Sequence, residues 1–68
     1  MITETDKQMG KRIQRLRKKV GLTQEQLAEK VSLSTKFIQF IETAHRKPSL
    51  KSLQKIARAL KTDIKNFF

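Results

Sequence analysis

The stretch TQEQLAEKVSLSTKFIQFIE, residues 23–42, predicts two short helices separated by a three-residue turn. Thr23 with Gln26 forms a capping box that begins the first helix, and Ser34 is a typical N-cap for the second. Helices that cross steeply need a small residue where they touch, and Ala28 fits this position. The pattern therefore predicts a helix-turn-helix, whose second helix can enter a major groove about 12 Å wide.

A longer amphipathic helix precedes this unit. Thr5 and Gln8 match a capping box, and Gly21 suits a left-handed C-terminal cap. Apolar residues recur between them with the period of one helical face, at Met9, Ile13, Leu16 and Val20. We expect residues 1–5 to form a flexible tail and residues 6–68 to form the folded domain.

A further helix follows the unit. Ser49 after Pro48 is its predicted N-cap, and Asp63 caps a last short turn from Ile64 to Phe68. The apolar face of this helix comprises Leu50, Leu53, Ile56, Ala57 and Leu60. The sequence shows little of the alternating pattern of strands, so the predicted fold class is all-α.

Composition excludes several classes of function. The chain has 68 residues, no cysteine and one histidine, so disulfides, thiolate nucleophiles and multi-histidine metal cages are excluded. No catalytic frame is recognisable, and we expect no enzymatic activity, metal or cofactor. Apolar runs do not exceed two residues, which predicts no membrane segment and a cytoplasmic protein. The formal charge of +10 favours a polyanionic partner such as DNA.

The order and spacing of three segments resemble one known family. These are GKRIQRLRKKVGLTQEQLAEK from Gly10, the frame S-x-x-x-I-x-x-I-E from Ser34, and RKPSL-x-SL-x-KIARAL from Arg46. Residues 10–68 are thus similar to the Cro/C1-type (Xre-like) helix-turn-helix family. The resemblance implies a compact five-helix, repressor-like domain with its helix-turn-helix in helices 2 and 3. It also implies a transcriptional regulator of repressor or controller type, acting as a homodimer on a palindromic operator in double-stranded DNA and located on the nucleoid.

The resemblance also implies roles for individual residues. Lys36 suits guanine, and Gln39 suits adenine. The implied base contacts are Thr35, Lys36, Gln39 and Phe40. The implied phosphate contacts are Gln24, Ser34, Thr43, His45, Arg46 and Lys47. A helix N-terminus offers free N–H groups to phosphate in any case, which supports Gln24.

Several positions depart from the family pattern. Glycines usual in its turns are replaced by Ser32, Ala44 and Lys61, so positive φ angles at non-glycine residues are expected, at a cost in stability. Phe40 replaces a polar residue, and groove contact, a partner surface and packing against Phe37 remain open for it. Phe37 is expected at the edge of the core. Most cations of the first helix are expected to be solvated.

Two further alternatives concern partners. Ile64, Phe67 and Phe68 are core or dimer-interface residues, and we favour a shared role in a homodimer interface. An antitoxin-like module with a cognate protein partner is the second functional hypothesis, with Phe40 and the terminal aromatics as its contact patch. Transcription machinery is another conceivable protein partner.

Overall fold

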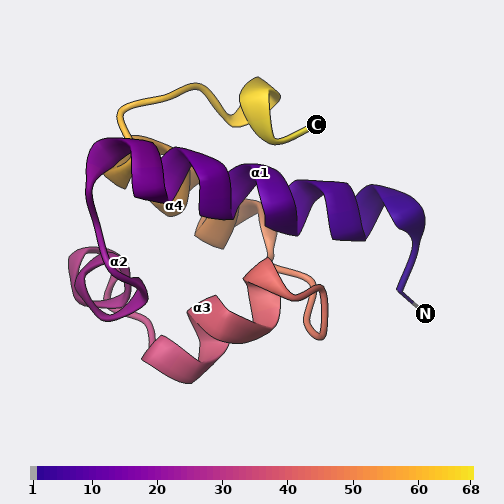
Figure 1. The fold of residues 1–68 in the computed structure, drawn as a ribbon, viewed down its shortest axis with the longest axis horizontal. Helices are drawn as coiled ribbons and strands as arrows, with labels where there is room; N and C mark the ends of the chain where they lie inside the picture. The colour runs from indigo at the N-terminus through magenta and orange to yellow at the C-terminus, as the bar shows by residue number, and fades with distance from the viewer. Residues whose placement is uncertain (1) are drawn as a thin grey trace.

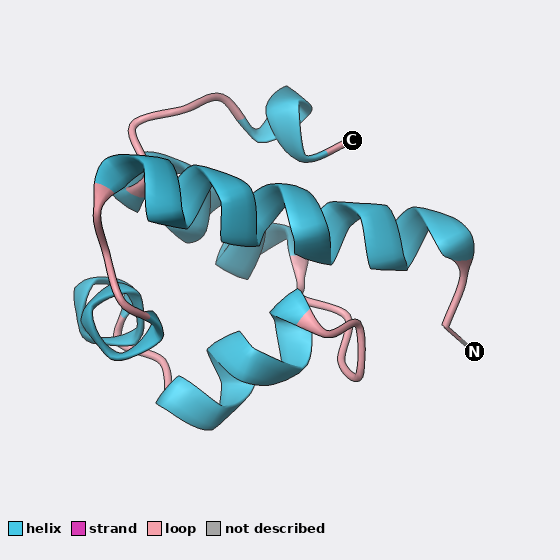
Figure 2. Ribbon diagram, viewed as in Figure 1, coloured by secondary structure: helices cyan, strands magenta, loops and turns pink. Residues whose placement is uncertain are grey.

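The computed structural model describes residues 2–68, which form four α-helices and a terminal 3₁₀ turn (Figure 1). The helices are α1 (Glu4–Val20), α2 (Gln24–Val31), α3 (Thr35–Glu42) and α4 (Leu50–Ala59), followed by the 3₁₀ turn η1 (Ile64–Phe67). Figure 2 shows helices and loops but no strand in this part of the chain. The all-α prediction is confirmed, but the fifth helix of the prediction is only a single 3₁₀ turn.

The long helix α1 organises the molecule. It packs against α3 on one side and against η1 on the other, while α2 contacts both α3 and α4 (Figure 1). Six large side chains are fully buried between these elements: Ile13, Leu27, Ile38, Ile41, Ile56 and Phe67. One core therefore holds the helix-turn-helix against α1 and α4.

The start of α1 differs from the prediction. Its capping box joins Thr3 and Asp6, whereas Thr5 already lies inside the helix, so the predicted box at Thr5 and Gln8 is wrong. Residues 4 and 5 of the predicted tail belong to α1, and Met1 lies outside the described residues. Thr3 and Asp6 form the same kind of reciprocal cap, so α1 begins earlier in the chain than predicted.

The remaining predicted caps are confirmed. Thr23 and Gln26 form the capping box of α2, and Gly21 closes α1 with a φ of 89°. Ser34 accepts a hydrogen bond from the Phe37 amide at the start of α3. Ser49 and Asp63 cap α4 and η1 in the same way.

Two apolar residues are placed outside the core, contrary to the periodicity. Val20 ends α1 with 41% of its surface exposed, and Leu50 begins α4 with 64% exposed. Both lie in the terminal turn of their helix. No helix within residues 2–68 has the length and apolar character needed to cross a membrane.

The three expected left-handed turns are present at non-glycine residues. Ser32, Ala44 and Lys61 have φ angles of 58°, 63° and 56°. Ser32 lies at the turn between α2 and α3, where its amide donates to the Ala28 and Glu29 carbonyls. The chain thus adopts left-handed turns at three positions without the glycines that make this conformation inexpensive.

Candidate nucleic-acid interface

Helix α3 presents two different faces. Ile38, Ile41 and Glu42 point into the protein and are buried. Lys36 and Gln39 are exposed on the other face. Thr35 and Phe40, also predicted to contact bases, are half-buried at its margins. The outward face therefore offers one cation, one amide and one hydroxyl to a groove.

A buried ion pair holds the end of α3 against α1. Arg17 Nε donates to Glu42 Oε2 at 2.6 Å, and another guanidinium nitrogen donates to Glu42 Oε1 at 3.1 Å. A third guanidinium nitrogen donates to the Leu22 carbonyl at 2.7 Å. The side chains of Arg17 and Glu42 are 7% and 0% exposed. Such two-bond pairing fixes the orientation of both groups.

This pair was not predicted, because most cations of the first helix were expected to be solvated and Arg17 is buried instead. A signal was present, since Arg17 follows Ile13 by four residues and so continues the buried stripe of α1. Glu42 is also the only acidic residue between Lys30 and Thr62. A lone acid at the end of an apolar helix face indicates a buried partner of opposite charge.

Gln24, a predicted phosphate contact, joins the same network. Its amide nitrogen donates to Glu42 Oε1 at 3.0 Å. A primary amide has two N–H groups, so one remains for another acceptor. The network places Gln24 at the first position of α2, beside the free amides of the helix N-terminus.

Close backbone contact supplements the ion pair. A Cβ atom at Gly10 would lie 2.6 Å from the carbonyl oxygens of both Ile41 and Glu42. Only glycine permits this approach of α1 to the end of α3. Gly10 and Arg17 thus secure α3 from one helix.

The loop after α3, residues 43–49, contains four of the predicted phosphate contacts. Thr43 Oγ1 donates to the Gln39 carbonyl at 2.8 Å and lies 2.8 Å from His45 Nδ1. The His45 ring is tilted by 46° against the Phe40 ring, with 6.0 Å between centroids. Phe40 therefore packs on His45, a contact outside the three alternatives that were open for it.

The two following cations are also placed by neighbours. The Arg46 guanidinium lies 5.7 Å from the centre of the Phe37 ring, a cation–π distance. Lys47 Nζ lies 3.5 Å from Asp6 Oδ2 of α1. The pKa of Asp6 is lowered, chiefly because the Thr3 amide donates to its carboxylate, with Lys47 adding a smaller effect. Lys47 thus has a carboxylate partner that a phosphate would have to replace.

Charge along α3 and the loop has a single sign at the surface. From Ser34 to Lys51 the only carboxylate is that of Glu42, which is buried against Arg17. The exposed side chains of this segment include the cations Lys36, Arg46, Lys47 and Lys51. Such a surface attracts a polyanion and repels none of its phosphates.

The predicted dimer residues are placed in three different environments. Phe67 is fully buried in the core of its own chain, which is the first of the two alternatives left open for it. Ile64 is half-buried, and Phe68 is 58% exposed. The aromatic patch predicted for a protein partner is likewise reduced, because Phe40 packs on His45 and Phe67 is internal.

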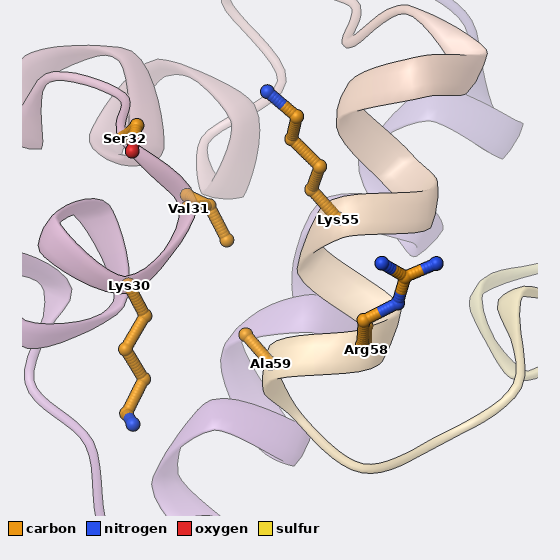
Figure 3. Close-up of a pocket in the computed structure, with 6 residues that line it drawn as sticks. All are labelled: Lys30, Val31, Ser32, Lys55, Arg58 and Ala59. Carbon is orange, nitrogen blue, oxygen red and sulfur yellow. The ribbon is translucent and has the colours of Figure 1, made fainter.

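A pocket of about 350 Å³ lies apart from α3, between the C-terminal parts of α2 and α4 (Figure 3). Val31 and Ala59 form its apolar part. Figure 3 shows the cationic ends of Lys30, Lys55 and Arg58 pointing in three different directions rather than toward one point. The cations therefore form no converging anion site. Within residues 2–68 no group of three His, Asp or Glu side chains is placed to hold a metal ion.

Comparison with known proteins agrees with this geometry. The helix-turn-helix family model matches residues 13–67. An uncharacterised HTH-type transcriptional regulator of Archaeoglobus fulgidus is 42% identical over 60 residues, covering 88% of this chain and 86% of the relative. The immunity repressor of Bacillus phage phi105 is 46% identical over 52 residues, which cover 76% of this chain and 36% of that repressor.

Solved structures show the same fold. The restriction-modification controller protein C.AhdI from Aeromonas hydrophila superposes with a TM-score of 0.88 at 32% identity, covering 91% of this chain and 94% of C.AhdI. The biofilm regulator SinR, solved in complex with DNA, gives 0.83 at 28% identity, covering 87% and 95% of the two chains. With its turn, buried ion pair and cationic helix face, the chain belongs to the Cro/C1-type (Xre-like) helix-turn-helix family of DNA-binding transcriptional regulators, which are not enzymes.

Proposed function

We propose that this chain binds double-stranded DNA in a sequence-specific manner and regulates transcription by placing α3 in the major groove. The observation that carries the proposal is the combination of a fixed α3 with a cationic outward face. The Arg17–Glu42 pair and Gly10 secure the helix from behind, while Lys36 and Gln39 extend from its exposed face. The similarity to SinR, solved in complex with DNA, supports the same arrangement.

In this arrangement the side chains divide into two groups. Thr35, Lys36, Gln39 and Phe40 contact base edges, with Lys36 directed to guanine and Gln39 to adenine. The second group binds phosphates and holds the duplex in register. It comprises Gln24, Ser34, His45, Arg46 and Lys47. Thr43, also expected from the resemblance, donates its one hydroxyl hydrogen to the Gln39 carbonyl and so has none for a phosphate. Ser34 accepts from the Phe37 amide and keeps its own hydrogen for a phosphate oxygen.

The experiment is selection of preferred sites from random duplex DNA, followed by fluorescence anisotropy on the selected site. Specific binding should exceed binding to a scrambled duplex by at least about 10³-fold at physiological salt. Affinity should also decrease steeply with salt, with a log–log slope of about −0.9 per phosphate contact. Equal affinity for selected and scrambled duplexes would contradict the proposal.

We further propose that two copies bind together, with half-sites about 34 Å apart. A groove lined by Gln54, Ala57, Arg58, Thr62, Asp63 and Ile64 runs along α4 and η1. Ile64 lines this groove, and Phe68, which directly follows η1, is exposed, so both suit contact with a second copy. A palindromic selected site would support this assembly.

The dimer is tested by comparing Phe68→Ser with wild type in sedimentation equilibrium. Phe68→Ser should weaken self-association with little change in thermal stability. Phe67→Ala is the matched variant inside the core and should instead lower stability by about 3–5 kcal/mol. Unchanged self-association in Phe68→Ser would remove this residue from the interface.

A further inference from the structure

The hydrogen bonds of Thr43 determine which nitrogen of His45 carries the proton. Thr43 Oγ1 donates its hydrogen to the Gln39 carbonyl at 2.8 Å. A hydroxyl has only one hydrogen, so toward His45 Nδ1, at 2.8 Å, the same oxygen must accept. The tautomer protonated at Nδ1 is the one that satisfies both contacts of the Thr43 hydroxyl.

This assignment limits what the neutral ring can bind. A neutral imidazole carries one N–H, so with the proton on Nδ1 the other nitrogen, Nε2, is only an acceptor. Phosphate oxygens of the DNA backbone are also acceptors. Neutral His45 thus has no donor for a phosphate, whereas the imidazolium form has an N–H on Nε2 as well.

We propose that His45 binds a DNA phosphate only as the imidazolium ion, so that pH adjusts the affinity of the domain for DNA. This inference rests on the proposed function and deepens it. Where the free ring is neutral, each His45–phosphate contact is then formed together with the uptake of one proton. The contact is present when the ring is charged and absent when it is neutral.

The surroundings of His45 keep the ring in this orientation. Its backbone amide donates to the Phe40 carbonyl at 2.7 Å, and its ring packs against the Phe40 ring. Turning the ring to present Nδ1 to a phosphate would break the bond to Thr43. The side chain itself is exposed, which leaves Nε2 accessible to a ligand.

The charged groups around His45 do not supply a competing anion. Arg46 and Lys47 share its loop, and Lys7 and Lys11 of α1 line a small pocket with Thr43 and Ala44. Glu42 borders that pocket but is bound to Arg17, and Asp6 is paired with Lys47. A DNA phosphate is therefore the anion that would stabilise the charged ring.

The tautomer is tested without DNA, by long-range ¹H–¹⁵N NMR of the imidazole at about pH 8.5, where histidine is neutral. His45 is the only histidine, so one set of ring signals is observed. We expect a pyrrole-type shift for Nδ1 and a pyridine-type shift for Nε2. In Thr43→Val, which lacks the accepting oxygen, the proton should move toward Nε2. Protonation of Nε2 in the wild type would overturn the proposal.

The effect on binding is tested by anisotropy with the selected duplex, from pH 5.5 to 8.0 at constant ionic strength. A charge-assisted hydrogen bond of this kind predicts a Kd about tenfold higher at pH 8.0 for each domain bound. His45→Gln should lack this component, and its remaining pH dependence measures all other groups, the α-amino group included. Thr43→Val should show a weaker pH dependence than wild type, because neutral His45 can then donate through Nε2.

The outcomes separate this inference from the proposed function. If wild type and His45→Gln bind the selected duplex with the same pH dependence, the inference is wrong and the proposed function stands. If no duplex is bound specifically at any pH, both are wrong. If the wild type gains affinity at low pH but Thr43→Val does so to the same extent, the tautomer argument is wrong.

Discussion

Arg17 and Glu42 lie 25 residues apart in the chain and meet in a buried two-bond ion pair that connects α1 to the end of α3. Because Glu42 also accepts from Gln24, the pair links the first position of α2 to the same point. Three helices are thus oriented by one carboxylate. Lys36 and Gln39, the exposed residues of α3 proposed to contact bases, lie on its other face, so the pair positions them without contacting a base.

Removing one partner of this pair should destabilise the fold strongly. Glu42→Leu leaves the Arg17 guanidinium buried without its counter-charge, which should cost about 3–5 kcal/mol in urea unfolding. In the double variant Arg17→Met/Glu42→Leu neither charge remains, and most of that stability should return. A single variant within about 1 kcal/mol of wild type would show that the pair is not buried in solution.

Gly10→Ala should destabilise the protein, although alanine is the better helix former by about 1 kcal/mol. The new Cβ would lie 2.6 Å from two carbonyl oxygens of α3, so α1 must move away from the end of that helix. The matched control is Gly21→Ala, where no atom lies within 4 Å but the φ of 89° costs about 1 kcal/mol. A higher melting temperature for Gly10→Ala would contradict the close contact.

Features that depend on neighbouring residues could be predicted from the sequence, whereas contacts between distant segments could not. Caps such as Thr23 and Ser34, and the left-handed Ser32, depend on a few neighbouring residues and were predicted correctly. Periodicity places Arg17 on the buried stripe of α1, but its pairing with Glu42 and the burial of Phe67 depend on packing between distant segments, which local periodicity does not report. The amphipathic pattern shows only that a helix has an apolar face. It does not show which turns of that face are covered, and the first turn of α4 leaves Leu50 exposed.

In the candidate site, too, some features could be predicted from the sequence and others could not. The exposed positions of Lys36 and Gln39 follow from the helical period, because the buried Ile38 and Ile41 fix the opposite face. The packing of Phe40 on His45 does not follow from any period. It arises because the left-handed Ala44 reverses the chain and returns His45 toward α3.

Replacing left-handed residues by glycine should stabilise the fold. Ser32→Gly and Lys61→Gly, both at exposed positions with positive φ, should each gain up to about 1 kcal/mol in chemical denaturation. Ala44→Gly should gain less stability. The Ala44 methyl is buried, and losing this buried apolar group should cancel much of what the relaxed φ contributes. A loss of stability in Lys61→Gly would show that the positive φ at this turn does not destabilise the fold.

Asp6→Asn should lower the melting temperature at pH 7 and have a smaller effect in acid. The folded-state pKa of Asp6 lies below its ordinary value of 3.8, chiefly because the Thr3 amide donates to the charged form. Its contribution is therefore fully present above the unfolded pKa and is lost as pH falls through the lower, folded pKa. The melting temperatures of wild type and Asp6→Asn should therefore differ at pH 7 but not at about pH 2. A difference that persists in acid would assign the effect to something other than the carboxylate charge.

Gln39→Ala and Arg46→Ala should separate base reading from phosphate binding. Gln39→Ala should relax the preference at one base pair by about 1–3 kcal/mol while nonspecific affinity stays the same. Arg46→Ala should weaken binding to all sequences alike and reduce the salt slope by about 0.9. Gln8→Ala and Arg15→Ala, both at exposed positions of α1, are the matched controls and should leave sequence preference unchanged. If Gln39→Ala selected the same site with the same discrimination, α3 would not read bases through this residue, and Lys36 would remain the one exposed side chain of α3 able to do so by hydrogen bonding.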